Sequence, residues 1–304
     1  MTFAFQIKNE IYNKSLRLRG DRARTYGLLL FARHFDSQRM LLSTEHRGVA
    51  RLYGDQISNL VGLQGSITLL SQNRGGRESF TVRVDSAADR QRVLDFFHQQ
   101  GDAIDQTLLD TPEAVFSFLA GAYLACGNIS DPEKTYRLEF ALSRPGLAEG
   151  FAALLEQAGF APKVSLRRGL PVVYFKESEQ IEELTAAMGA SKQALEIMNI
   201  KIYKDIRNRA NRQSNCDTAN IDKTIAAGQQ QVADIRLIAE NRGLDSLSDD
   251  LCQLAQLRLE HPEASLRELS ELLGGGVTRS GVNHRMGRIA ALAAEIREGQ
   301  GGCA

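Results

Sequence analysis

The stretch that decides the fold is VFSFLAGAYLACG, residues 115–127. It is almost entirely apolar, with Ala120, Gly121 and Ala122 at its centre, and we predict one helix over residues 111–127. Because glycine has no side chain, the backbone of a second helix can come close at Gly121. The stretch therefore leaves room at its centre for a close contact with another helix.

An earlier stretch matches this one, and the elements that follow both occur in the same order, which is the pattern of an internal repeat. In TYGLLLFAR, residues 25–33, Gly27 corresponds to Gly121. The first copy has predicted helices at 21–35, 57–63 and 87–100, and predicted strands at 40–45, 49–56, 66–71 and 79–85. The second has helices at 111–127, 146–158 and 179–188, and strands at 128–130, 135–143, 163–168 and 172–177. This order predicts an α+β fold of two similar lobes, residues 1–105 and 106–190.

From residue 191 the strand pattern disappears and a mostly helical region begins. We predict a basic helical linker over 191–243, a helix-turn-helix domain over 244–298 and a flexible tail over 299–304. In the domain, Ser248 is expected to cap a helix over 249–260, and Ser265 with Glu268 forms a capping box for a helix through 273. After a break at 274–276, Ser280 is expected to cap a third helix that ends near residue 298.

The third helix has the side chains of a DNA-recognition helix. Between Val277 and Ile289 it carries arginine, histidine and asparagine but no acid. Arginine suits guanine edges and asparagine suits adenine edges in the major groove. The residues expected to contact double-stranded DNA are Arg279, Ser280, Asn283, His284, Arg285 and Arg288. Short serine-capped helices are also typical of protein-binding bundles, and that interpretation stays open.

A second basic group lies in the predicted linker and is interleaved with asparagines. Its members, which suit contacts to DNA phosphates, are Lys204, Arg207, Arg209 and Arg212. The alternative is an ordinary solvated face of a linker.

The composition limits the classes of partner and compartment. The 37 basic and 37 acidic residues balance, so attraction to DNA depends on local clustering. The four cysteines lack the short pairs of zinc sites, no apolar segment reaches the roughly 20 residues of a membrane span, and the first residues do not form a signal peptide. We expect a cytoplasmic, nucleoid-associated protein without a cofactor or a membrane partner.

Residues 119–127 resemble the signature helix of the LAGLIDADG homing endonucleases. Aligned on Gly121, the acid that holds the catalytic metal in that family falls on Cys126, and in the first copy on Ala32. A thiol is a poor ligand for Mg²⁺ and a methyl group is none, so no metal and no nuclease activity are expected. The remote alternative is a nuclease that uses Asp36 or Asp131, although both acids fit loop caps better.

Three further strings, in the same order along the chain, resemble the WhiA family of bacterial transcription regulators. They are FLAGAYL with GNISDPEK (118–134), NRANRQSNCDTAN (208–220), and ASLREL with SGVNHR (264–285). The resemblance implies a non-catalytic, sequence-specific DNA-binding protein that acts in cell division, chromosome segregation or sporulation. An alternative is a scaffold whose lobes bind a protein of the transcription or division machinery while the C-terminal domain binds DNA.

Overall fold

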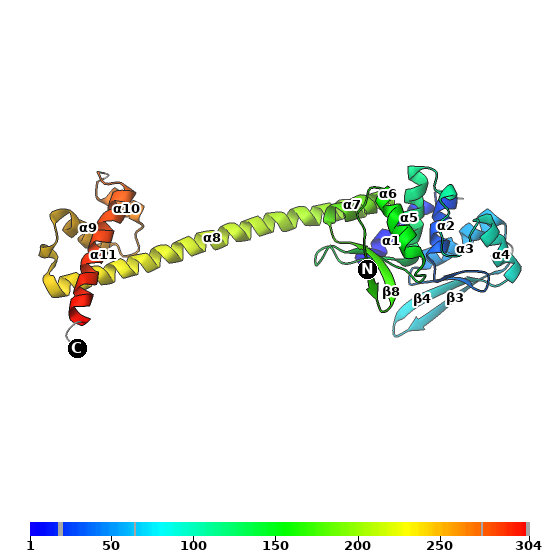
Figure 1. Ribbon diagram of the computed structural model, residues 1–304, viewed down its shortest axis with the longest axis horizontal. Helices are drawn as coiled ribbons and strands as arrows, with labels where there is room; N and C mark the ends of the chain where they lie inside the picture. Colours follow the sequence, from blue (N-terminus) through cyan, green and yellow to red (C-terminus); the bar gives the residue numbers. More distant parts are fainter. Residues whose placement is uncertain (18–20, 64, 275, 302–304) are drawn as a thin grey trace. The chain divides into compact units, whose positions relative to one another are not determined.

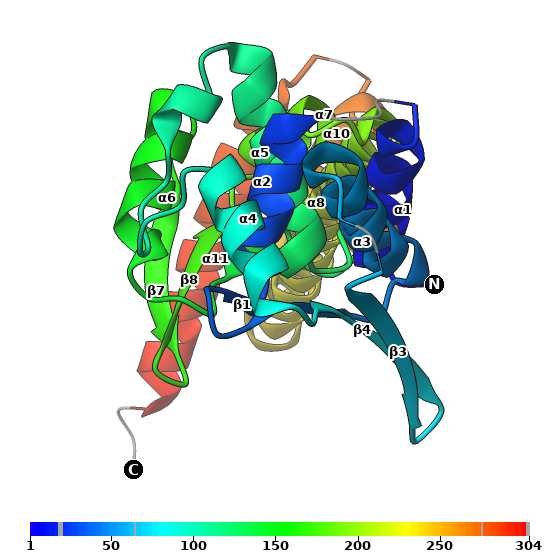
Figure 2. The same cartoon turned by 90° about the vertical axis from the view of Figure 1, so that its right-hand side faces the viewer.

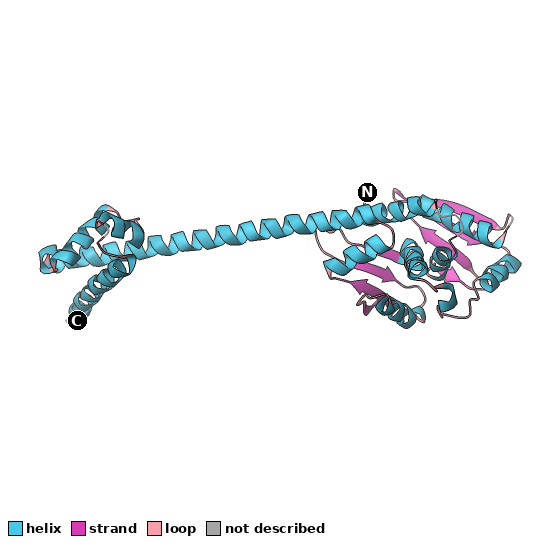
Figure 3. Ribbon diagram, turned by 90° about the horizontal axis from the view of Figure 1, so that it is seen from above, coloured by secondary structure: helices cyan, strands magenta, loops and turns pink. Residues whose placement is uncertain are grey.

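The computed structural model describes residues 1–17, 21–63, 65–274 and 276–301 (Figure 1). The chain divides into two compact units, residues 1–205 and 206–304, each with its own hydrophobic core. Among the described residues every strand belongs to the first unit (Figure 3). No helix in the described ranges combines the length and apolar character of a membrane-spanning segment.

The first unit contains two copies of one α+β arrangement, which confirms the predicted repeat. It begins with α1 (Phe3–Ser15). The first copy is α2 (Arg22–Leu30), β1 (His34–Phe35), β2 (Met40–Thr44), α3 (Arg47–Val61), β3 (Ile67–Arg74), β4 (Arg77–Val84) and α4 (Ala87–Phe96). After η1 (Gln106–Leu108), the second copy is α5 (Pro112–Cys126), β5 (Gly127–Ile129), β6 (Leu138–Ala141), α6 (Leu147–Gln157), β7 (Lys163–Arg167), β8 (Leu170–Phe175) and α7 (Ser178–Ala187).

The two sheets have the same topology. Their strand orders are β1-β2-β4-β3 and β5-β6-β8-β7, with every pairing antiparallel. In Figure 2 the strands of both sheets lie below α2 and α5, which stand next to each other between the two copies. One hydrophobic core joins the two copies, so the two lobes fold as a single unit.

The backbones of α2 and α5 touch, as the paired glycines predict. A Cβ atom added to Gly27 would lie 2.1 Å from the carbonyl oxygen of Phe118, and one added to Gly121 would lie 2.1 Å from that of Arg24. Both separations are far below van der Waals contact. Any residue with a Cβ atom at either position would therefore collide with the backbone of the opposite helix.

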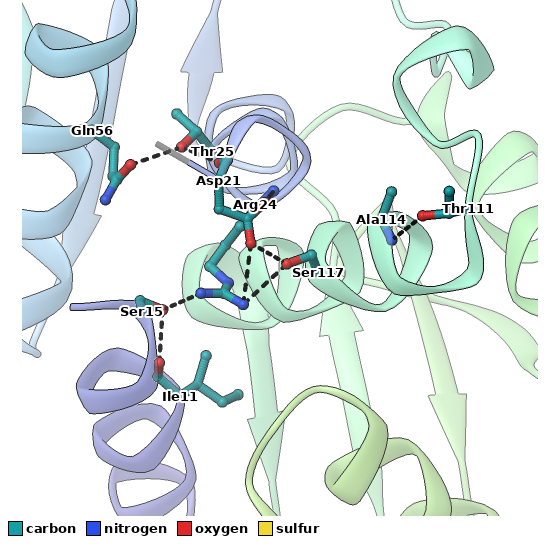
Figure 4. A network of polar contacts seen from close by, with 9 residues as sticks. All are labelled: Ile11, Ser15, Asp21, Arg24, Thr25, Gln56, Thr111, Ala114 and Ser117. Carbon is teal, nitrogen blue, oxygen red and sulfur yellow. Dashed lines mark hydrogen bonds and ion pairs between the residues drawn. The ribbon is translucent and has the colours of Figure 1, made fainter. Parts of the chain in front are cut away.

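A polar network links the N-terminal ends of α2 and α5 to the end of α1 (Figure 4). The guanidinium of Arg24 donates to the hydroxyls of Ser15 and Ser117, each at 3.0 Å, and lies 3.3 Å from the carboxylate of Asp21. The Ser117 hydroxyl in turn donates to Asp21. Burial lowers the pKa of Arg24, and the Asp21 carboxylate opposes that shift.

Two sequence expectations for the first copy are wrong. The strand expected at 49–56 is part of α3, whose buried residues follow helical rather than alternating spacing; they are Val49, Ala50, Leu52, Tyr53, Gly54, Gln56 and Ile57. The helix expected at 21–35 ends at Leu30, and residues 34–35 form β1. The sequence also gave no indication of α1, which Thr2 caps and whose residues Ile7 and Ile11 are buried.

The second unit is entirely helical in its described part. The long helix α8 (Ser191–Arg242) enters it, followed by η2 (Leu244–Ser246), α9 (Asp249–Glu260), α10 (Leu266–Leu272) and α11 (Arg279–Gly301). Ile235 and Ile238, near the end of α8, are buried among the apolar residues of α9, α10 and α11. Residues predicted to form a linker thus supply part of the helix-turn-helix core.

The helix boundaries in this unit differ from the expectations in detail. The capping box of Ser265 and Glu268 is present. Ser248 occupies the cap position of α9, but its hydroxyl donates to the Asp250 carboxylate and accepts no N–H of the helix backbone. Ser280 does not cap α11, because the helix begins at Arg279 and the hydroxyl of Thr278 accepts the N–H of Gly281. Residue 275 of the predicted break and residues 302–304 of the predicted tail lie outside the described ranges.

Candidate nucleic-acid interface

Helix α11 is fixed along one side and exposed along the other. Val282, Met286 and Ile289 are buried against the core of the second unit, at helical spacing. The opposite side exposes Arg279, Ser280, Asn283, His284 and Arg288. Within the described residues, the side chains of Arg279, Asn283 and His284 have no hydrogen bond or ion pair. They are therefore available to a ligand.

Arg285 and Arg288 are held by an acid of α9. Arg285 lies 3.3 Å from the Asp250 carboxylate, and Arg288 lies 3.9 Å from it. The Ser248 hydroxyl, which donates to Asp250 at 2.6 Å, and the two arginines hold the pKa of Asp250 below its usual value. The Arg285 side chain is only 25% exposed, which distinguishes it from the free side chains on α11.

Contacts that the sequence did not indicate fix the turn before α11 and the loop before α10. Ser270 on α10 donates to the carbonyl of Val277. Arg258 on α9 is 2% exposed and donates to the carbonyls of His261, Pro262 and Ala264. Sequence reasoning missed these residues because a serine or arginine on a helix is typical of an exposed position.

A glycine in α8 is also required by the second unit. A Cβ atom at Gly228 would lie 2.6 Å from the carbonyl oxygen of Pro262. Asp234, two turns further along α8, is 4% exposed and pairs with Arg297 of α11. The end of α8 therefore positions both the loop before α10 and the body of α11.

The basic residues of α8 do not share one face. Lys204 is already engaged in the first unit: its ammonium donates to the carbonyl of Pro132 at 2.6 Å and lies 4.6 Å from the Tyr136 ring centroid. Arg207, Arg209 and Arg212 are exposed. At 3.6 residues per turn, Arg207 lies about 200° around the axis from Arg209, whereas Arg209 and Arg212 lie about 60° apart.

The positions aligned with catalytic acids hold no metal-ligand cluster. Ala32 is 1% exposed, and burial raises the pKa of the Cys126 thiol to about 12, so it stays protonated. Asp36 accepts the N–H groups of Gln38 and Arg39, as expected for a loop cap. Asp131 likewise accepts the N–H of Glu133. Across the described ranges no group of three or more His, Cys, Asp or Glu residues could hold a metal ion.

The architecture defines a class of protein in which paired LAGLIDADG-like lobes precede a helix-turn-helix domain. Residues 115–207 match the family model of the WhiA LAGLIDADG-like domain, and residues 210–293 match that of the WhiA C-terminal HTH domain. A relative from Desulfitobacterium hafniense, a probable cell division protein WhiA, is 38% identical over 277 residues, covering 90% of this chain and 87% of its own. The chain belongs to the WhiA family.

Other comparisons agree on the family and the fold. A probable cell division protein WhiA from Clostridium perfringens is 44% identical over 196 residues, which cover 64% of this chain and 62% of the relative. The crystal structure of full-length DUF199/WhiA from Thermatoga maritima matches 97% of this chain and 99% of its own, with a TM-score of 0.57 and 23% identity. The expected fold class is thereby confirmed.

Proposed function

We propose that this protein is a non-catalytic, sequence-specific DNA-binding protein of the cytoplasmic nucleoid that regulates transcription. Its relatives bear the name of probable cell division proteins, which supports a role in cell division, chromosome segregation or sporulation. The observation that carries the proposal is the exposed face of α11, where Arg279, Asn283 and His284 have no hydrogen-bond or ion-pair partner among the residues that the structure describes.

The proposed mechanism places the N-terminal half of α11 in the major groove of double-stranded DNA. Asn283 suits the N6 and N7 groups of adenine, and Arg279 suits a guanine edge or a phosphate. Ser280 lies in the first turn of α11, where helix N–H groups favour a phosphate. The carboxylate of Asp250, which lies beside this face, is paired with Arg285 and Arg288, and this pairing offsets its repulsion of the DNA. In this mechanism Arg285 and Arg288 lie next to the DNA, and of the two Arg288 also contacts it.

The basic segment of α8 supplies phosphate contacts in this proposal. Arg209 and Arg212 lie on one side of the helix and are the pair that can follow a single backbone strand. Arg207 points to another side. Lys204 contributes less to DNA, because its ammonium already contacts Pro132 and Tyr136.

The test begins with genome-wide mapping of bound sites and continues with fluorescence anisotropy on the recovered sequence. We expect Asn283→Ala to lose about 1–3 kcal/mol of discrimination at one base pair. Asn241→Ala, at the end of α8, is the control outside the α11 face. A folded Asn283→Ala protein with unchanged base preference would remove this helix from the recognition role.

A second candidate function, docking of a protein partner on the lobes, is favoured by the second sheet. Arg137, which precedes β6, and Arg167 of β7 are both tied to Glu139, at 2.9 and 3.0 Å, and are not free for phosphates. The β7–β8 hairpin leaves Leu166 76% exposed and Val164 53% exposed. Cross-linking in cells with a photoreactive residue at Leu166 tests this candidate; recovery of DNA alone from that position would contradict it.

A further inference from the structure

A cleft of about 420 Å³ lies beside the residue that replaces the catalytic acid in the second copy. Ala125 and Gly127, the neighbours of Cys126 on both sides, line it. Its other walls come from the start of α1, from the loop between β2 and α3, and from β4 and β5. Neither the family membership nor the proposed recognition helix assigns a role to this cleft.

Lys8 of α1 places a positive charge at the end of α5, in this cleft. Its ammonium donates to the carbonyl oxygen of Leu124 at 3.2 Å and lies 5.8 Å from the ring centroid of Tyr123. An ammonium group has three N–H donors, so this one carbonyl leaves donors for a further acceptor. In the homing endonucleases that this helix resembles, the acid at the position of Cys126 holds a metal cation. In this chain a lysine supplies the positive charge.

His46 adds a buried donor without a partner. The side chain lines the cleft and is 5% exposed, with its ring stacked on Phe5 at a centroid distance of 4.5 Å. Its Nδ1 atom accepts the N–H of Val49 at 3.2 Å, so the hydrogen of the neutral ring is on Nε2. Among the described residues, Nε2 has no hydrogen-bond partner. A buried donor of this kind is normally satisfied, and because Nε2 is closed to solvent, an acceptor bound in the cleft reaches it only when the side chains around the ring move apart.

The remaining groups favour an anion, with one exception. Ala4, in the first turn of α1, lines the cleft, and the first N–H groups of a helix have no partner within the helix. The hydroxyls of Ser43 and Thr44 lie on another wall. The exception is Glu45, an exposed carboxylate at the same cleft, which repels an anion and thereby supplies an internal control.

We infer that this cleft is a metal-free phosphate-binding site, in which the Lys8 ammonium supplies the charge and the His46 Nε2–H and the first turn of α1 donate hydrogen bonds. The phosphate belongs either to a DNA backbone or to a small phosphorylated molecule, since both present the same oxygens. The inference does not rest on recognition by α11, because the site lies wholly in the first unit and its primary probe is inorganic phosphate.

The experiment titrates the full-length protein with inorganic phosphate at pH 7, using phosphorus NMR line broadening to obtain Kd. We expect Lys8→Gln to weaken binding about tenfold or more, the effect of losing a charge-assisted hydrogen bond. Lys192→Gln, which makes the same charge change at an exposed position of α8, should bind as the wild type does. His46→Asn keeps an acceptor for the α3 cap but removes the Nε2 donor, and should weaken binding severalfold.

Glu45→Gln gives an independent result, because an exposed carboxylate can be removed without disturbing the fold. We expect it to tighten phosphate binding severalfold. Absence of saturable binding to the wild type would overturn the inference, as would equal Kd values for wild type and a folded Lys8→Gln. If Lys8→Gln does not fold, Glu45→Gln decides: tighter binding supports the site and an unchanged Kd overturns it.

Competition then identifies the source of the phosphate. Displacement of bound phosphate by a short duplex without an operator sequence, measured with the α11 variant Asn283→Ala, assigns the site to the DNA backbone. Displacement by a nucleoside monophosphate but not by the duplex assigns it to a small molecule. Failure of sequence-specific binding by α11 would leave the phosphate titration unchanged, so the two proposals fail separately.

Discussion

The two ends of the α2–α5 pair differ in how far they keep the features of the homing-endonuclease signature helices. At the N-terminal end and along the pair, Arg24 links three helices, and Gly27 and Gly121 bring two backbones into contact. At the C-terminal end, Ala32 and Cys126 stand where paired acids would hold a metal, and a cleft opens beside Cys126. The difference teaches that the contacts between the two helices do not depend on the acids, since the helix pair persists where the acids are replaced.

The sharpest way to break this comparison is to add a methyl group at the close approach. Gly121→Ala should destabilise the protein by about 3 kcal/mol or more, because its Cβ would lie 2.1 Å from a backbone oxygen that cannot rotate away. Gly150→Ala in α6 is the matched control, because the nearest atom to its Cβ lies at 4.0 Å. Urea unfolding measures both. Equal stabilities of the two variants would show that the helices do not meet at Gly121.

The next largest effect is expected at the N-terminal network. Arg24→Met should lower the free energy of unfolding by about 3 kcal/mol, because it leaves the mostly buried carboxylate of Asp21 without its cation. Arg92→Met removes an exposed partner of Asp89 and should cost less than about 1 kcal/mol. If both substitutions cost the same, the network does not hold the helix ends together.

Stability measured as a function of pH tests the C-terminal end of the helix pair, where Lys8 lies. Burial lowers the pKa of Lys8 from 10.5 to about 8, so between these values the unfolded chain binds more protons than the folded one. The free energy of unfolding of the wild type should therefore rise from pH 8 to pH 10.5 relative to Lys8→Gln, by an amount on the order of 1–3 kcal/mol. Parallel stability curves for the two proteins would mean that Lys8 is solvated.

The smallest expected effect is no effect. Wild-type protein given Mg²⁺ or Mn²⁺ should leave a bound duplex intact on a denaturing gel, because cleavage by this fold requires oxygen ligands from both signature helices. Metal-dependent cleavage that Asp131→Asn abolishes would show that the C-terminal end has kept its chemistry, contrary to the comparison.

Local patterns were enough to predict the repeat, the glycine contact and the capping box, because each is marked by a short string of residues. The strand predicted at 49–56 was wrong. The apolar residues Val49, Leu52 and Tyr53 were taken as strand residues, because the sequence did not indicate that His46 caps a helix just before them. The cleft could not be predicted, since Lys8 and His46 meet the end of α5 only through tertiary packing. On α11, the sequence predicted six contact residues alike, and no sequence pattern could show that Asp250 holds Arg285 and Arg288.

The Asp250 contact has a consequence for the ionic-strength dependence of DNA binding. DNA carries condensed cations, and each arginine that neutralises a phosphate releases some of them, which sets the slope of affinity against salt. Arg288 already carries a counterion that belongs to the protein, 3.9 Å away on α9. When Arg288 contacts a DNA phosphate, the Asp250 carboxylate stays nearby, so the pair brings less net positive charge to the DNA than a free arginine would. The slope of log affinity against log salt concentration should therefore be smaller than the number of arginines that contact the DNA backbone would give.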